Sequence, residues 1–223
     1  MAEVFGAWKE ADAHTKLLVT GYIRTIQHLH GLDNFPEMVS YICLAYYWFV
    51  ERFESCSSSM TISSIDHPND TVKISGSSRY SDAVGSKVIH SMDKCLTRWD
   101  LKADTPSGYI RVVGITSNWD NLGKFYERKD CFNYGYNGYN GDKVSQYEFI
   151  KYGPIWDSGD IIRIELDLRT GSTLKFYKNG VCPDPSQSVA YEVAIGEDIE
   201  YKLIVGMYGQ NDGVTIIHFE QSL

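Results

Sequence analysis

The stretch GDIIRIELDLRTGSTLKFYKNG, residues 159–180, decides the fold. Apolar residues at positions 162, 164, 166 and 168 alternate with charged residues, which is typical of an antiparallel strand with one buried face. Gly171 lies in a turn, since glycine tolerates the positive φ that tight turns require. A return strand follows, and Asn179-Gly180 is a strong signal for a second tight turn. The stretch therefore predicts a β-hairpin with one face in a core.

The chain on either side of this hairpin has the same texture. From Met60 onward, short apolar alternations are separated by Gly, Asn, Asp, Pro and Ser. Many short strands at this spacing predict a mainly β fold, an antiparallel sandwich. The candidate strands are 60–65, 71–75, 86–90, 97–102, 110–116, 147–151, 161–168, 173–178, 201–207 and 214–219.

The first 56 residues predict a different structure, an α-helical hairpin. Leu18, Tyr22, Ile26 and Leu29 recur at helical spacing, and Pro36 suits the first turn of a second helix. That second helix would carry an apolar stripe of Val39, Cys43, Tyr46, Val50 and Phe53. The polar run from Cys56 to Ser59 then marks a boundary. We expect a helical hairpin over 1–56 and a β-sandwich domain over 57–223.

Composition excludes several classes of function. The 223 residues carry 21 Lys and Arg against 29 Asp and Glu, a formal charge of −8, with no basic cluster to bind nucleic acid. The longest uncharged run, residues 38–50, is shorter than the roughly 20 residues that a membrane span needs. Five scattered cysteines and the lack of a secretory leader favour the cytoplasm. The sequence predicts no metal site, no cofactor, no nucleic-acid partner and no membrane association.

The hairpin resembles the signature of SPRY domains: Gly-Asp, an apolar strand ending in Asp, a glycine turn, and F-x-K-N-G. Further pieces follow in the family's order, namely Trp99–Lys102, Ile110–Ile115, Tyr134–Tyr136, Tyr201–Leu203 and Val214–Phe219. The resemblance covers about Met60 to Leu223. It implies a bent antiparallel β-sandwich, a concanavalin-like jelly roll, that binds protein partners through edge loops and is not an enzyme. The first 55 residues are similar to a helical preface found before SPRY or kelch domains in protist proteins.

Some binding residues are implied by this resemblance. Tyr208-Gly209, with Asn211 in the same loop, resembles the tryptophan-glycine loop that contacts peptide in SOCS-box-linked SPRY proteins. Arg79 is the nearest counterpart of the basic residue in that family's pocket. In this family such modules often serve as recognition parts of ubiquitin-ligase or signalling proteins.

Other candidates come from the residues themselves. Asn118-Trp119-Asp120 places a tryptophan in a turn-rich loop, where it is either a plug beneath the loop or a recognition anchor. Among the tyrosines threaded by glycines after residue 133, Tyr139 is the candidate for exposure, and Tyr134 and Tyr136 are expected to pack inward. The predicted function is capture of a peptide or protein, as an adaptor, with the oligomeric state left open.

Two other functions remain as alternatives. Glu165 and Asp167 would lie about 6.5 Å apart on one strand face, near the roughly 5–5.5 Å of retaining glycoside hydrolases. However, Arg163 on the same face would neutralise one of them, and Asp167 is expected to bond backbone N–H groups of the turn. The second alternative is a lectin-like jelly roll that stacks aromatic residues on sugars, although Asn211-Asp212 alone is too small a cluster for a calcium cage.

Overall fold

A computed structural model describes residues 51–66, 69–74, 81–104, 110–120, 133–146 and 148–222. Residues Glu51–Leu223 form one compact unit, and Met1–Val50 form another. The predicted helical hairpin therefore lies outside the described residues, except for its end. There the structure corrects the prediction, because Phe53–Cys56 is strand β1 of the sandwich rather than the end of a helix. Phe53, the last residue of the predicted helical stripe, is instead buried in the β core.

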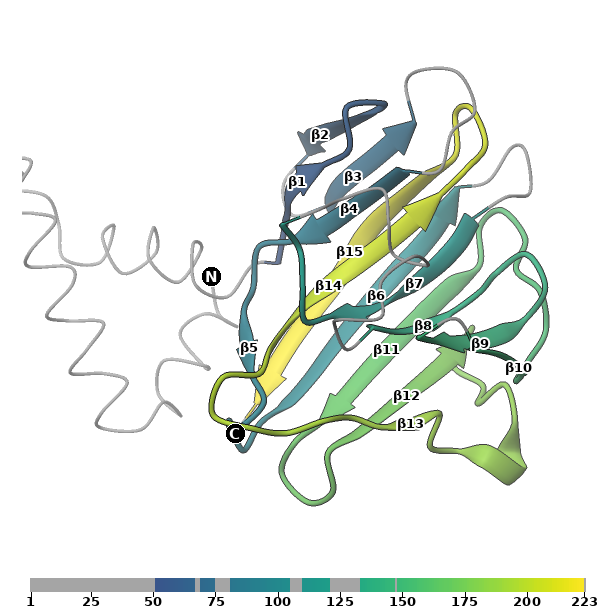
Figure 1. Ribbon diagram of the computed structural model, residues 1–223. Helices are drawn as coiled ribbons and strands as arrows, with labels where there is room; N and C mark the ends of the chain where they lie inside the picture. Colours follow the sequence, from purple (N-terminus) through teal and green to yellow (C-terminus); the bar gives the residue numbers. More distant parts are fainter. Residues whose placement is uncertain are drawn as a thin grey trace, which may run out of the picture. The chain divides into compact units, whose positions relative to one another are not determined.

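The described residues form two antiparallel sheets (Figure 1). In the first, sheet A, the neighbours run β1, β4, β14, β7, β8, β9, β10, and β5 pairs with the start of β14. Its strands are β1 (Phe53–Cys56), β4 (Ser81–Gly85), β5 (Ile89–His90), β7 (Ile110–Thr116), β8 (Asn133–Tyr136), β9 (Asp142–Ser145), β10 (Glu148–Lys151) and β14 (Glu200–Met207).

Sheet B has seven strands in the order β13, β12, β11, β6, β15, β3, β2. They are β2 (Met60–Asp66), β3 (Asn69–Ile74), β6 (Leu96–Asp104), β11 (Ile161–Asp167), β12 (Thr173–Lys178), β13 (Tyr191–Glu192) and β15 (Gly213–Ser222). A single 3-10 turn, η2, covers Pro185–Gln187, and the described residues contain no α-helix. None of them forms a helix long and apolar enough to span a bilayer.

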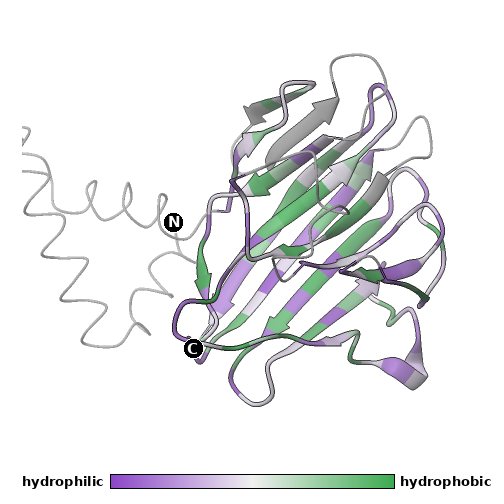
Figure 2. Cartoon of the chain, in the orientation of Figure 1, coloured by the Kyte–Doolittle hydropathy of each residue, from purple (hydrophilic) through white to green (hydrophobic). Residues whose placement is uncertain are grey.

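The sandwich core lies between the two sheets. Sheet A contributes side chains such as Leu203 and Val205, sheet B contributes Ile164 and Leu166, and all belong to one buried cluster. Figure 2 shows hydrophobic and hydrophilic residues alternating along strands of sheet B, as a half-buried strand requires. Trp99 in β6 is fully buried within this cluster.

The predicted hairpin is confirmed. Strands β11 and β12 pair antiparallel, with Ile164 opposite Phe176 and Leu166 opposite Leu174 on the core side. Asn179 adopts a φ of 50° and Gly180 a φ of 78°, the left-handed pair expected of a tight Asn-Gly turn.

Other strands differ from the prediction. Of the predicted strand 86–90, only Ile89–His90 is a strand, β5, and the strand before it, β4, ends at Gly85. Strands β1, β4, β8, β9 and β13 were not among the predicted strands.

Candidate protein-binding site

Strand register divides the predicted binding residues between the two ends of sheet A. Strands β14 and β7 pair from Lys202 opposite Thr116 to Met207 opposite Ile110. Tyr208 follows Met207 at one end, whereas Asn118 comes shortly after Thr116 at the other. At about 3.3 Å per residue, these ends lie roughly 16 Å apart. The seven described candidates therefore do not form a single cluster.

Tyr208 begins a closed loop that joins sheet A to sheet B. The backbone N–H of Gly209 donates to Oδ2 of Asp212 over 3.0 Å, and the N–H of Asp212 donates to the carbonyl of Gly209 over 3.1 Å. Asn211, exposed between them, has a left-handed φ of 67°. Gly209 and Asp212 are buried, while Tyr208 is 40% exposed. The loop thus holds one tyrosine outward on a fixed backbone.

Sequence reasoning missed the role of Asp212 in this loop. Its carboxylate bonds to a nearby backbone N–H, as Asp commonly does in turns. The sequence does carry one signal of this turn role, because Asp212 is followed by a glycine and comes after a short polar run.

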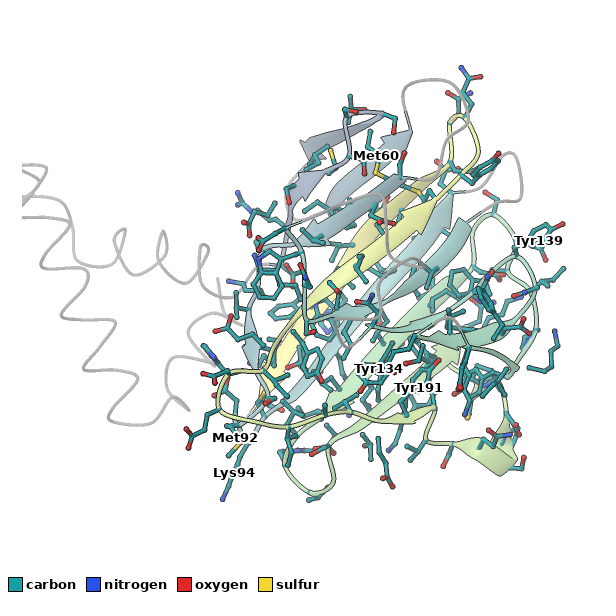
Figure 3. All side chains as sticks on the ribbon, viewed as in Figure 1. Met60, Met92, Lys94, Tyr134, Tyr139 and Tyr191 are labelled. Carbon is teal, nitrogen blue, oxygen red and sulfur yellow. The ribbon has the colours of Figure 1, made fainter. Side chains whose placement is uncertain are left out.

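Tyr139 lies at the same end of sheet A as Tyr208. Tyr136 in β8 pairs with Val113, so the turn from β8 to β9 emerges beside the end where Met207 lies. Tyr139 is 48% exposed, and its N–H donates to Oδ1 of Asn137 over 2.9 Å. Figure 3 places Tyr139 at this end, with Met92 and Lys94 at the opposite end. The expected exposure of Tyr139 is confirmed.

Tyr134 and Tyr136 point into the core, as expected. Tyr136 is fully buried, and its hydroxyl donates to the carbonyl of Pro154 over 2.6 Å. The ring of Tyr134 packs against that of Tyr191, with ring centroids 5.1 Å apart (Figure 3). These two tyrosines support the exposed turn and are not available to a partner.

The loop after β7 turns tightly at the other end. Both the N–H and the carbonyl of Asn118 bond to Oγ1 of Thr116, over 3.2 and 3.0 Å. The N–H of Asp120 donates to Oδ1 of Asn118 over 3.3 Å, and Asp120 is exposed. Trp119 is half-buried and packs against aliphatic side chains of sheet A. Of the two alternatives for this residue, its position fits a plug beneath the loop better than an exposed recognition anchor. Arg79 lies outside the described residues.

The acid pair of the glycosidase alternative lies in a ladder of charges on the outer face of sheet B. Register places Glu220, Arg98, Glu165 and Lys175 directly opposite one another across β15, β6, β11 and β12. The Nε of Arg98 lies 2.8 Å from Oε2 of Glu165, and Nζ of Lys175 lies 3.7 Å from Oε1. Glu165 is thus held between two cations.

Asp167 has a separate partner. Its carboxylate accepts bonds from the backbone N–H and the guanidinium of Arg169, over 3.0 and 3.1 Å, which confirms its expected turn role. The Arg169 guanidinium lowers the pKa of Asp167 below its usual value. A catalytic acid needs the opposite shift. Arg163, expected to neutralise one of the pair, instead forms a two-bond pair with Asp100, over 2.7 and 2.8 Å.

The described residues contain no group of three or more His, Cys, Asp and Glu side chains that could hold a metal ion. Asp212, the acid considered for a lectin-type calcium cage, is buried and bonded to Gly209.

The chain was compared with models of known protein families, with curated proteins and with solved structures. A family model described as the SPRY domain matches residues 98–217. A search of curated proteins gives no match. Among solved structures, a human SPRY domain aligns with a TM-score of 0.54 and 14% identity, over 75% of this chain and 99% of that one.

Two further solved structures are similar. The SPRY domain of human HERC1 aligns with a TM-score of 0.49 and 20% identity, over 73% of this chain and 96% of its own. The PSpry domain of TRIM65 aligns with a TM-score of 0.49 and 14% identity, over 76% of this chain and 92% of its own.

Proposed function

Because this chain belongs to the SPRY domain family, whose members are protein-interaction modules, we propose that it captures a peptide or protein surface at the end of sheet A that carries Tyr139 and Tyr208. The observation that carries the proposal is the Tyr208 loop. A closed backbone presents an exposed aromatic side chain there, so little conformational entropy is lost when a partner binds. Tyrosine is among the residue types enriched at binding hot spots.

The surroundings of Tyr208 favour recognition over chemistry. The only acid pair that the sequence offered for hydrolysis lies on the other sheet, and each of its carboxylates is bonded to its own arginine. We further propose a cytoplasmic adaptor or substrate-recognition role in a ubiquitin or signalling complex, since SPRY domains commonly serve in this way. The partner is a protein, with no part for nucleic acid, membrane or cofactor.

The test is affinity capture of binding partners by the full chain, compared among three forms. Tyr208→Ala should lower capture by about tenfold or more, as loss of a hot-spot aromatic does. Its unfolding midpoint should stay within a degree or two of the wild type, because the side chain is exposed. Met92→Ala, which removes a 58% exposed side chain at the opposite end of the sandwich, is the matched control and should capture normally. Equal capture by all three forms would refute the proposed site.

A further inference from the structure

Three asparagines in the chain are followed directly by glycine: Asn137, Asn140 and Asn179. In such a pair the backbone nitrogen of the glycine, which has no Cβ beside it, can attack the side-chain carbonyl carbon of the asparagine. The reaction needs a glycine nitrogen that is free to attack, space for the ring that forms, and water to open that ring. The structure supplies these conditions unequally at the three pairs.

The Asn137-Gly138 pair is closed to this reaction. Both residues are buried, and Asn137 is only 3% exposed. The backbone N–H of Asn137 donates to the carbonyl of Asp142 over 2.7 Å, and its Oδ1 accepts the N–H of Tyr139 over 2.9 Å. The carbonyl of Gly138 accepts the N–H of Trp156 over 2.9 Å. Attack at this pair therefore requires the turn to open first.

The Asn140-Gly141 pair is also held closed. The N–H of Gly141 donates to the carbonyl of Asn137 over 2.9 Å, so the nitrogen that would attack is engaged. A Cβ built at Gly141 would overlap the carbonyl oxygen of Gly153, which leaves no space beside that nitrogen. The side chain of Asn140 bonds twice to Asp142, over 2.6 and 3.1 Å.

The Asn179-Gly180 pair meets all three conditions. Both residues are exposed, in a turn that Lys178 and Val181 close with two backbone hydrogen bonds of 2.9 Å. Among the described residues, the N–H of Gly180 has no hydrogen-bond acceptor. A Cβ built at Gly180 would have no atom within 4 Å. The nitrogen is therefore free, and water reaches it.

The side-chain amide of Asn179 is also placed for attack. Its Oδ1 accepts the backbone N–H of Ile161 over 2.8 Å, and negative charge would form on this oxygen during attack. A donor already aimed at that oxygen stabilises the charge. Its Nδ2 donates to Oδ1 of Asp160 over 2.7 Å, a bond that is exposed to water and so opposes departure of the nitrogen less than a buried bond would.

We propose that Asn179 is a site of spontaneous deamidation, with water as the co-reactant. The backbone nitrogen of Gly180 loses its proton to solvent and bonds to Cγ of Asn179. The bond from Cγ to Nδ2 breaks, and that nitrogen takes a proton from solvent and leaves as ammonia. Water then opens the cyclic imide, which leaves aspartate or isoaspartate in place of Asn179. The inference goes beyond the proposed protein binding and does not depend on it.

The modification changes the charge of the turn that follows β12. Asp160 loses the amide donor that lies 2.7 Å from its Oδ1 and gains a second carboxylate beside it. The Nζ of Lys178, 2.8 Å from Oδ2 of Asp160, then faces two carboxylates instead of one. Isoaspartate also lengthens the backbone by a carbon, which strains the bonds between Lys178 and Val181 that close the turn. We therefore expect deamidation to loosen this turn.

The experiment incubates the full chain in mildly alkaline buffer and follows each Asn-Gly pair by peptide mass spectrometry. In the folded chain, Asn179 should convert at least about fivefold faster than Asn137 or Asn140, because hydrogen bonds at those two pairs must break first. In urea, where these contacts are lost, the three pairs should convert at similar rates. Gly180→Ala should slow conversion at Asn179 and leave the other two pairs unchanged, since the added methyl group crowds the attacking nitrogen.

Conversion of Asn137 or Asn140 as fast as Asn179 in the folded chain overturns the proposal, and so does an unmodified Asn179. A preference for Asn179 that persists unchanged in urea also overturns it, because the selectivity would then not come from the fold. This comparison uses only the wild-type chain, so it holds even if Gly180→Ala does not fold. Asn179→Asp carries the charge of one product and should lower the unfolding midpoint, and an equal midpoint overturns the expected loosening.

Discussion

At the scale of single residues, the most consequential side chain outside the binding site is Glu51. It is 1% exposed, and one carboxylate oxygen accepts the indole N–H of Trp99 over 2.8 Å. The other oxygen accepts the backbone N–H groups of Ser86 and Lys87, over 2.7 and 3.1 Å. Burial raises the pKa of Glu51 above its usual 4.5, although these bonds partly oppose the shift. The carboxylate joins the start of the described chain to both sheets.

The raised pKa predicts how the stability contributed by Glu51 varies with pH. Folded Glu51 holds its proton more tightly than unfolded Glu51, so its contribution is fully present below pH 4.5 and is lost as pH rises through the folded pKa. The free energy of unfolding of the wild type minus that of Glu51→Gln should therefore fall as pH rises from about 4 to about 8. Urea unfolding at a series of pH values measures this difference.

Asp167→Asn is the control of opposite sign. Arg169 lowers the pKa of Asp167, so the Asp167 contribution is present above the usual pKa of 3.8 and is lost as pH falls. The free energy of unfolding of the wild type minus that of Asp167→Asn should therefore rise with pH over the acidic range. If the wild-type-minus-variant differences for Glu51→Gln and Asp167→Asn change in the same direction with pH, the pKa of Glu51 is not raised by its burial.

At the scale of elements, strands β7 and β8 approach so closely that only glycine fits at Gly114. A Cβ built there would overlap the carbonyl oxygen of Tyr134 and lie 2.7 Å from Cα of Gly135. Both neighbours are backbone and cannot rotate away.

Gly114→Ala should therefore be strongly destabilising, by about 3 kcal/mol or more, because overpacking against backbone cannot be relieved by a side-chain rotation. Gly171→Ala is the matched control, since the nearest atom to its new Cβ is a methyl of Thr173 at an ordinary 3.6 Å. Gly171→Ala should change the free energy of unfolding by less than about 1 kcal/mol. Chemical denaturation compares the two, and similar losses would refute the close approach of β7 and β8.

At the scale of the whole molecule, the residue at which the sandwich domain starts affects its stability. The compact unit starts at Glu51, six residues before the boundary predicted at residue 57. Those six residues contain Glu51 and strand β1, which pairs with β4 and buries Phe53.

A chain of residues 51–223 should therefore fold stably, and a chain of residues 57–223 should be less stable by more than about 3 kcal/mol. Loss of a buried phenylalanine alone accounts for about that much, and the buried indole N–H of Trp99 would also lose its acceptor. Thermal and urea unfolding of the two chains decides the point. Equal midpoints would place the true domain start at residue 57.

The sequence by itself determined those features that depend on neighbours along the chain. The β11–β12 hairpin and the Asn-Gly turn that follows β12 were predictable because alternation and turn chemistry are local. Tyr139 was predictable as exposed, and Asp167 as a turn residue, for the same reason. Strands β4 and β8 were not, because every residue in each is buried. With both faces of sheet A covered, these strands carry no alternation of polar and apolar residues.

Only the tertiary structure decided which loops share an end of the sandwich. Tyr208 and Tyr139 lie at one end of sheet A, and Asn118 lies at the other, because β14 pairs with β7 in one particular register. It also decided that Trp119 packs against aliphatic side chains of sheet A and that Glu51 accepts a hydrogen bond from Trp99, 48 residues away in sequence. Such contacts form between segments that are distant in the chain, so no local pattern of residues encodes them.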